Sequence, residues 1–365
     1  MTLINGRAYK KSELLNEGTP VLRIQNLNGG NNWYYSDLML PEDKYCEKDD
    51  LLYAWSATFG PYRYLGEKAI YHYHIWKILP HRSVINKAYA FYALMNITDN
   101  VKNKAHGISM LHITKGGMED MDVYCPPLPE QKKIAAILDA ADAYRQKTKA
   151  LIEKYDALTQ SLFLDMFGDP VTNPKGWEKV PTIRHCDCIV PGRNKPKSFT
   201  GNIPWITTAD LNHLGYTYQS KSSIGLTQSE ITEVRARIIP QKSVLMTCVG
   251  DLGLTSVNSN DVVMNQQLHA FICHEELNNV FLMYNLSFQT PYMLKMASST
   301  TVPYMNKTIA NNTPTIVPPL PLQNQFAEHV QKIEAQKAKA QASLEKAEAL
   351  FNSLLQRAFK RELTS

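Results

Sequence analysis

Two long stretches of this chain repeat apolar residues at alternating steps of three and four. The first follows Pro129 and the second follows Pro321. This heptad-like spacing puts the apolar side chains on one face of an α-helix and is typical of coiled coils. Each run predicts a helix of roughly 36 residues, about 54 Å long. The predicted seam residues are Ile134, Ile137, Ala141, Tyr144, Leu151, Tyr155, Leu158 and Leu162 in the first helix and Phe326, Val330, Ile333, Leu344, Phe351 and Leu354 in the second.

The two runs belong to an internal repeat. The tetrapeptide PPLP precedes both of them, at Pro126–Pro129 and at Pro318–Pro321, 192 residues apart. At the same offset Gln131 matches Gln323, and the match continues without gaps into the helices. A match of this length is not chance, so we interpret the chain as a duplicated unit of one domain followed by one helix.

The segments before each helix predict a mixture of strands and short helices. Runs such as AIYHYHIWKIL in the first segment and KSVLMTCVG and QLHAFIC in the second are typical of strands. The predicted fold class is α+β, with two mixed α/β domains, two long helices and an internal pseudo-two-fold repeat. The predicted boundaries are 1–127 and 169–317 for the domains and 128–168 and 318–365 for the helices.

A helix this polar on three faces needs a partner, and the other copy is the simplest one. The second domain must begin where the first helix ends. An internal two-fold relation then gives each domain its own end of an antiparallel helix pair. The alternative is that each helix packs separately on its own domain.

Composition adds few constraints. The chain has 365 residues, 44% of them hydrophobic, and a net charge of +5, which permits a polyanionic partner without demanding one. The six cysteines form no CxxC pair, and Cys186 and Cys188 lie too close for ordinary zinc ligands, so we expect buried thiols. The first residues do not resemble a signal peptide, and no apolar run reaches the roughly 18 residues of a membrane span. We therefore expect a cytoplasmic protein without a membrane partner.

The sequence contains no catalytic signature. We find no phosphate-binding loop, no GxGxxG turn, no HExxH and no GxSxG. His72 and His74 alternate on one predicted strand, but no third ligand lies nearby, so we expect no metal site. These absences favour binding over catalysis.

The stretch PPLPEQKKIAAILDAADAYRQKTKALIEKYDALTQSLFLDMFGDPVTNPKGWEKV, at Pro126–Val180, resembles the central region of the specificity subunit of type I restriction–modification enzymes. PPLPLQNQFAEHVQKIEA, at Pro318–Ala335, resembles its distal counterpart. The resemblance implies two target recognition domains held by an antiparallel coiled coil, each domain recognising one half of a split sequence in double-stranded DNA.

The resemblance also implies partners. Two DNA methyltransferase subunits would dock on the helices and hold S-adenosylmethionine, and restriction/motor subunits would join for cleavage. This chain itself is then expected to be non-catalytic and to bind no cofactor. One departure is that a first strand equivalent to Trp177–Ile189 is expected to be missing from the first domain.

Polar and basic loop residues are the candidate DNA contacts, because Arg can pair with guanine, Asn with adenine and Lys with phosphate. A solvated surface charge is the alternative for each of them. His112 with Lys115 and Tyr304 with Lys307 match across the repeat and form the preferred pair of sites. The candidates are Arg23, Asn26, Ser56, Arg63, His112 and Lys115 in the first domain and Arg193, Lys195, Lys197, Thr207, Asp210, Tyr304 and Lys307 in the second.

Three functions remain open from the sequence. The first is a DNA-recognition subunit in which helix length sets the spacing of the half-sites, since about 54 Å corresponds to roughly 16 base pairs. The second is a coiled-coil structural adaptor that binds no DNA. The third is an enzyme with its own site, although no S-adenosylmethionine motif is visible. Trp55, Tyr62 and Tyr64 around Arg63 suit either DNA stacking or core packing.

Overall fold

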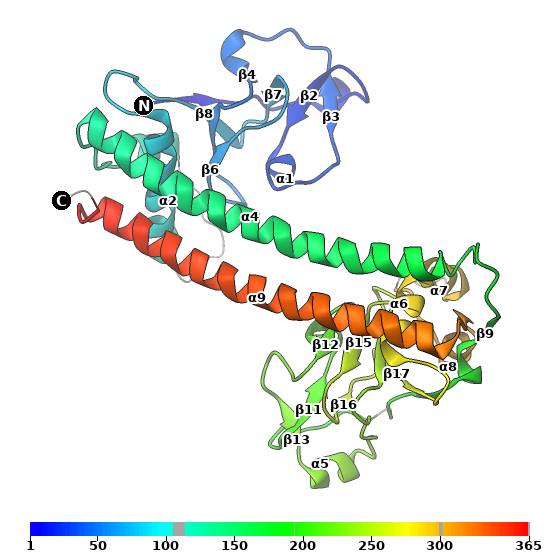
Figure 1. The fold of residues 1–365 in the computed structure, drawn as a ribbon. Coiled ribbons are helices and arrows are strands. Elements are labelled where there is room, and N and C mark those ends of the chain that lie inside the picture. Colours follow the sequence, from blue (N-terminus) through cyan, green and yellow to red (C-terminus); the bar gives the residue numbers. More distant parts are fainter. Residues whose placement is uncertain (105–113, 193, 299–301, 364–365) are drawn as a thin grey trace. The chain divides into compact units, whose positions relative to one another are not determined.

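The computed structural model describes residues 1–104, 114–192, 194–298 and 302–363. The chain forms two compact units: unit 1 comprises Met1–Lys149 and Ala342–Ser365, and unit 2 comprises Ala150–Gln341. The two 40-residue helices are α4 (Leu128–Phe167) and α9 (Leu320–Phe359) (Figure 1). Each has one part in unit 1 and the other part in unit 2. Each helix starts inside a PPLP motif, where a proline in the first turn costs no hydrogen bond.

The described part of unit 1 forms two four-stranded sheets, with strand orders β1-β8-β5-β6 and β3-β2-β7-β4. The strands are β1 (Thr2–Asn5), β2 (Thr19–Leu22), β3 (Tyr34–Ser36), β4 (Tyr45–Cys46), β5 (Leu51–Ala54), β6 (Gly60–Arg63), β7 (Ala69–Tyr71) and β8 (Ile75–Leu79); the shorter helices are α1 (Ile24–Leu27), α2 (Lys87–Lys104), α3 (Lys115–Glu119) and the 3-10 turns Lys11–Glu13 and Glu42–Lys44.

Helix α2 packs against the first sheet and against both long helices of unit 1. Tyr89 and Tyr92 of α2 share a buried core with Tyr53 of β5, Ile134 of α4 and Phe351 of α9. The long helices therefore form part of the hydrophobic core of the unit.

The described residues of unit 2 form sheets of five, three and two strands, with orders β10-β17-β14-β15-β12, β13-β11-β16 and β18-β9. Phe163 of α4, Phe281 of α6 and Phe326 of α9 pack together, with ring centroids 5.6 and 5.4 Å from Phe163. The elements are β9 (Lys179–Pro181), β10 (Cys186–Ile189), β11 (Ile203–Ile206), β12 (Tyr216–Thr217), β13 (Gly225–Leu226), β14 (Val244–Thr247), β15 (Thr255–Asn258), β16 (Val263–Met264), β17 (Leu268–Cys273), β18 (Pro314–Ile316), α5 (Gln228–Glu233), α6 (Asn279–Phe288), α7 (Thr290–Met296), α8 (Lys307–Asn311) and the 3-10 turns Thr182–Arg184 and Thr208–Asp210.

Strand pairing confirms the internal repeat. In unit 1, β8 pairs antiparallel with β1 and β5, and β2 pairs parallel with β7. In unit 2, β17 pairs antiparallel with β10 and β14, and β11 pairs parallel with β16. The two units therefore share one topology, as the matched sequence segments predict.

The predicted absence of a first strand in the first domain is wrong for the part of Trp177–Ile189 that forms β10. β1 pairs with β8 as β10 pairs with β17, with Leu3 opposite Ile78 and Cys188 opposite Phe271. Among its described residues, unit 1 lacks counterparts of the β9–β18 pair and of the edge strand β12. The sequence pattern missed β1 because Leu3 is the single buried residue of that strand.

The long helices run antiparallel within each unit. In unit 1, the Arg145 guanidinium lies 4.3 Å from the ring centroid of Phe351, and Lys149 pairs with Glu348 at 3.1 Å. In unit 2, Asp156 pairs with Lys337, whereas Phe167 further along α4 packs on Phe326. Residues further along α4 therefore contact residues earlier in α9, as in an antiparallel helix pair.

The predicted seam positions of α9 are buried or half-buried, whereas four of those in α4 are exposed. Phe326, Val330, Leu344 and Phe351 are buried, and Ile333 and Leu354 are half-buried. In α4, Ile134 is buried and Ala141, Tyr155 and Leu162 are half-buried. The four exceptions are Ile137, Tyr144, Leu151 and Leu158, whose exposed fractions are 38%, 53%, 42% and 49%.

The error in α4 has a simple cause. Leu138, Thr159 and Phe163 are buried, each one residue after a predicted seam position. The buried stripe therefore continues by steps of four where the prediction used steps of three. Adjacent apolar pairs such as Ile137 and Leu138 make the two choices look alike in the sequence.

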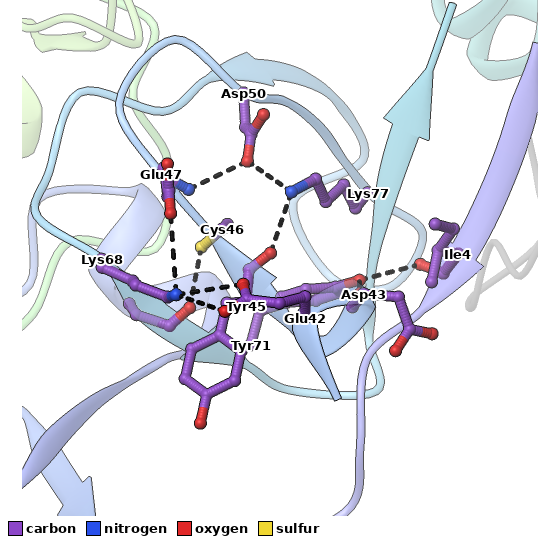
Figure 2. A network of polar contacts seen from close by, with 11 residues as sticks. Ile4, Glu42, Asp43, Tyr45, Cys46, Glu47, Asp50, Lys68, Tyr71 and Lys77 are labelled. Atoms are coloured by element: carbon purple, nitrogen blue, oxygen red, sulfur yellow. Dashed lines mark hydrogen bonds and ion pairs between the residues drawn. The ribbon is translucent and has the colours of Figure 1, made fainter. Parts of the chain in front are cut away.

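A polar network anchors β4 in unit 1 (Figure 2). The Lys77 ammonium pairs with Asp50 at 2.7 Å and donates to the carbonyl of Tyr45 at 3.0 Å. Asp50 in turn accepts a hydrogen bond from the backbone N–H of Glu47 at 2.9 Å. The Lys77 and Asp50 side chains are only 15% and 21% exposed. This ion pair therefore holds β8, β4 and the turn before β5 together.

We expect Lys77→Met to lower the free energy of unfolding by about 2 kcal/mol or more, because it leaves a largely buried carboxylate without its cation. Lys68→Met is the matched control. Lys68 pairs with Glu42 at 2.8 Å, but these side chains are 44% and 80% exposed, so its loss should cost less than about 1 kcal/mol. Urea titrations of both variants check this. Equal midpoints for the two variants would contradict the assigned role of Lys77.

All six cysteines are free, and Cys186 and Cys188 are buried as predicted. Burial raises the pKa of Cys188 to about 11 and that of Cys46 to about 12. Within the described ranges, no group of three or more potential metal ligands occurs. No helix in the same ranges is both long and apolar enough to cross a membrane.

Candidate nucleic-acid interface

The turns that follow β2 and β11 carry equivalent predicted contacts. The backbone N–H of Arg23 donates to Asn26 Oδ1 at 3.1 Å, and that of Thr207 donates to Asp210 Oδ2 at 2.7 Å. The Asn26 and Asp210 side chains are 9% and 6% exposed. Asn26 also donates to the carbonyl of Asn32 at 3.0 Å. Both side chains therefore shape a turn, and their base contacts remain a prediction.

Arg23 is a half-buried cation beside this turn. Its guanidinium donates to the carbonyl of Asn32 at 2.8 Å and lies 4.1 Å from the ring centroid of Tyr34. Its Nε is buried without a hydrogen-bond partner. Burial, followed by the charges of His74 and Arg23, lowers the pKa of His72 to about 4. Arg23 thus has one buried N–H without a partner beside this turn.

Arg63 joins β6 to α4 and α2 within unit 1. Its guanidinium pairs with Asp139 of α4 at 2.6 Å and lies 4.5 Å from the ring centroid of Phe91. Nearby, Tyr64 is buried in the core and Tyr62 donates to Asn28 Oδ1 at 2.9 Å, which favours the core-packing interpretation for these two rings. Ser56 is half-buried in the bend after β5.

The preferred pair of sites lies at the starts of α3 and α8. Thr114 accepts a hydrogen bond from the N–H of Gly117 at 3.1 Å, and Asn306 accepts one from the N–H of Ile309 at 2.9 Å. Lys115 and Lys307 are therefore the first residues of two helices with the same kind of cap. Lys115 pairs with Glu119 at 3.6 Å, and Lys307 is exposed. Tyr304 is 45% exposed, and His112 lies outside the described residues.

We expect Lys115→Ala and Lys307→Ala each to weaken binding to duplexes of any sequence. Each would lower the slope of log affinity against log salt by about one, because one phosphate contact is lost. Fluorescence anisotropy at several salt concentrations measures both quantities. Lys346→Ala, on the exposed face of α9, is the control. A slope equal to that of the wild type would refute the assignment.

The loop after β10 carries the remaining basic candidates. Lys195 and Lys197 are exposed, and Arg193 lies outside the described residues. The amide of Gln266 donates to the carbonyls of Gly192 and Asn194 at 3.1 and 3.3 Å. These bonds hold the start of the loop against the turn that precedes β17.

The matched glutamines that follow the two PPLP motifs are functional positions that were not among the predicted site residues. Gln131 accepts a hydrogen bond from the N–H of Asn86 at 2.7 Å and donates to the carbonyl of Pro126 at 2.7 Å. Gln323 accepts from the N–H of Asn278 at 2.9 Å and donates to the carbonyl of Pro318 at 2.8 Å. Each fully buried glutamine therefore joins the start of a long helix to the loop before α2 or α6. The sequence signal for this role was that Gln131 and Gln323 match at the 192-residue offset of the repeat.

Curated relatives match part of the chain. The EcoBI type I restriction enzyme specificity subunit of Escherichia coli is 29% identical over 154 residues, which are 42% of this chain and 32% of that protein. The MjaIX type I restriction enzyme specificity subunit of Methanocaldococcus jannaschii is 27% identical over 136 residues, which are 36% of this chain and 31% of that protein. The chain thus spans about a third of the length of the curated relatives it matches.

Solved structures share the fold over nearly the whole chain. A type I restriction–modification S subunit from M. genitalium has a TM-score of 0.55 and 14% identity, covering 98% of this chain and 93% of its own. A chain from a study of complex assembly and conformational transition of the type I R–M system has a TM-score of 0.55 and 18% identity, covering 99% and 97%.

The family profile described as type I restriction modification DNA specificity domain matches residues 1–154 and 190–348. The two matched segments follow the internal repeat, one in each half of the chain. Together they cover most of its 365 residues. The chain belongs to the family of type I restriction–modification DNA specificity proteins.

Proposed function

We propose that this chain is the DNA-recognition subunit of a type I restriction–modification complex and that it recognises a bipartite site. One observation carries the proposal: the DNA specificity profile matches two segments of the chain, and each lies within one copy of a repeat whose strand pairing is the same. Two equivalent folds with different loop residues suit two different half-sites.

The proposed roles of the segments follow the order of the repeat. The proposed recognition domains are residues 1–127 and 169–317, and the proposed spacer helices are residues 128–168 and 318–365. The chain supplies recognition, whereas two methyltransferase subunits supply S-adenosylmethionine and the chemistry, and restriction/motor subunits supply cleavage. Such a complex acts on chromosomal and incoming DNA, so its place is the cytoplasm.

We further propose that the spacer helices set the distance between the half-sites. Helix α4 is continuous from Leu128 to Phe167 and contributes to both units. A continuous helix resists bending, so its length of about 60 Å fixes a reach of roughly 18 base pairs or fewer. The spacer of the recognised sequence is then a property of the helices and the half-sites are properties of the domains.

The exposed apolar residues of α4 offer a surface for a partner subunit. Ile137 and Tyr144 in unit 1 and Leu151 and Leu158 in unit 2 recur every seven residues along the helix. Their heptad spacing matches what another helix would bury. We propose that a methyltransferase subunit covers these side chains.

Mapping methylated bases in cells that express this chain with its methyltransferase tests the proposal. We expect a motif of two short specified sequences separated by an unspecified spacer. A structural adaptor that binds no DNA would instead leave methylation without a motif that depends on this chain. Purified chain should also bind duplexes with an affinity that falls as salt rises, which an adaptor would not do.

A further inference from the structure

Two short turns occupy the same place in the two units. Residues 72–74 (His-Tyr-His) connect β7 to β8, and residues 265–267 (Asn-Gln-Gln) connect β16 to β17. Each turn carries the chain from one sheet of its unit to the other. None of these residues is among the predicted DNA contacts. We call them turn 1 and turn 2.

Matched backbone hydrogen bonds show that the two turns share one scaffold. The N–H of His72 donates to the carbonyl of Leu22 at 2.9 Å, and the N–H of Asn265 donates to that of Ile206 at 2.9 Å. The third residue of each turn is held in the same way. The carbonyl of His74 accepts from the N–H of Trp55 at 3.2 Å, and that of Gln267 accepts from the N–H of Cys248 at 2.8 Å.

The flanks of both turns are buried. Tyr71 and Ile75 enclose turn 1, Met264 and Leu268 enclose turn 2, and all four are at most 2% exposed. Gly6 approaches turn 1 so closely that a Cβ there would lie 2.3 Å from the carbonyl oxygen of His72. The backbone of each turn is therefore enclosed on both flanks, and the two turns differ in the side chains they carry.

Turn 1 presents aromatic rings and imidazoles. Tyr73 is 39% exposed, and its ring centroid lies 3.9 Å from that of His74 and 6.0 Å from that of Trp55. The indole N–H of Trp55 donates to the carbonyl of Tyr73 at 2.8 Å, which fixes both groups. Tyr9 stacks on His72 from the segment after β1.

Turn 2 presents amides instead. Gln266 and Gln267 are exposed, and Asn265 donates to Gln267 Oε1 at 3.1 Å. Side-chain amides can donate to and accept from the major-groove edge of adenine at the same time. The exposed Lys195 and Lys197 follow the segment that Gln266 contacts, and they supply positive charge for phosphates. Turn 2 thus places exposed amides beside basic residues, with the Gln266 amide nitrogen also bonded to the loop that carries them.

We propose that turn 1 and turn 2 are the specificity-determining elements of the two units and contact base edges in the major groove of double-stranded DNA. Turn 2 reads at least one A·T pair through its glutamine amides, and turn 1 reads a different half-site through Tyr73 and its histidines. The inference rests on the proposed function and names the residues that distinguish its two half-sites.

The test uses the full chain with its methyltransferase subunit and the duplex motif that methylation mapping defines. Affinities are measured by fluorescence anisotropy for duplexes in which each specified base pair is replaced in turn. We expect Gln266→Ala with Gln267→Ala to weaken binding to the full motif by about 5- to 150-fold, the range for one lost bidentate base contact. Discrimination should disappear at one or two A·T pairs of one half-site. Tyr73→Ala should have the corresponding effect in the other half-site alone.

Two exposed residues of the same types outside the turns serve as controls. Gln241→Ala and Tyr218→Ala should leave affinity and discrimination unchanged. Turn variants that discriminate every base pair like the wild type would overturn the inference, and so would a uniform loss on all duplexes. A wild-type chain that yields no bipartite motif would overturn the proposed function itself and the inference with it.

Discussion

Replacing Gln131 by leucine is expected to lower the free energy of unfolding of unit 1 by about 3 kcal/mol or more. The fully buried Gln131 side chain bonds the N–H of Asn86 and the carbonyls of Val84 and Pro126, at 2.7, 2.9 and 2.7 Å. Leucine has a similar volume and no polar atoms, so these backbone groups are left buried without partners. Each such loss costs about 1 to 3 kcal/mol.

Hydrogen exchange measures the loss of stability separately in unit 1 and unit 2. Gln131→Leu should accelerate exchange in α2, which begins next to Asn86, and leave α6 unchanged, whereas Gln323→Leu should do the reverse. Gln160→Leu, on the exposed face of α4, is the control and should change neither helix. Exchange in α2 of Gln131→Leu that matches the wild type would show that the glutamine does not hold the unit together.

We expect replacing Leu151 and Leu158 together by lysine to prevent stable association with the proposed methyltransferase subunit. The two side chains are 42% and 49% exposed, so the chain itself tolerates charge there. In the complex each leucine would contribute about 1.5 to 3 kcal/mol of apolar burial, and each lysine would add a desolvation cost. We expect affinity for the partner to fall at least about 100-fold, since every 1.4 kcal/mol is tenfold.

Size-exclusion chromatography of co-expressed subunits measures this association. The control replaces Gln146 and Gln160 by lysine, which puts two charges on exposed polar positions of the same helix. DNA binding by the free chain should survive both changes. A double leucine variant that still elutes with the methyltransferase subunit would show that the partner docks elsewhere.

Much of the fold could be predicted because each copy of the repeat shows the same motifs in the same order. The matched PPLP motifs and glutamines located both long helices, and the antiparallel pairing inside each unit followed from the duplication. The apolar spacing did not predict which residue is buried where two neighbouring residues are both apolar. Ile137 and Leu138 are both apolar, and only packing against α2 and α9 decides that Leu138 is buried.

The candidate site was less predictable because polar residues have several uses. Arg63 looks like a DNA contact in sequence, but its partner Asp139 lies 76 residues away. Asn26 and Asp210 look like base readers, yet each closes a turn through its neighbouring backbone. The turns at residues 72–74 and 265–267 became comparable only when matched hydrogen bonds showed one scaffold under different side chains.

The spacing of the half-sites tests the central claim most directly. One heptad of seven residues is inserted into both long helices, after Lys149 in α4 and after Gln341 in α9, so that the buried stripe stays in phase. Methylated motifs are then mapped for the wild type and the insertion variant. Seven residues add about 10.5 Å, so we predict two unchanged half-sites and a spacer longer by at least one and at most about three base pairs. An unchanged spacer between the same half-sites would contradict the account.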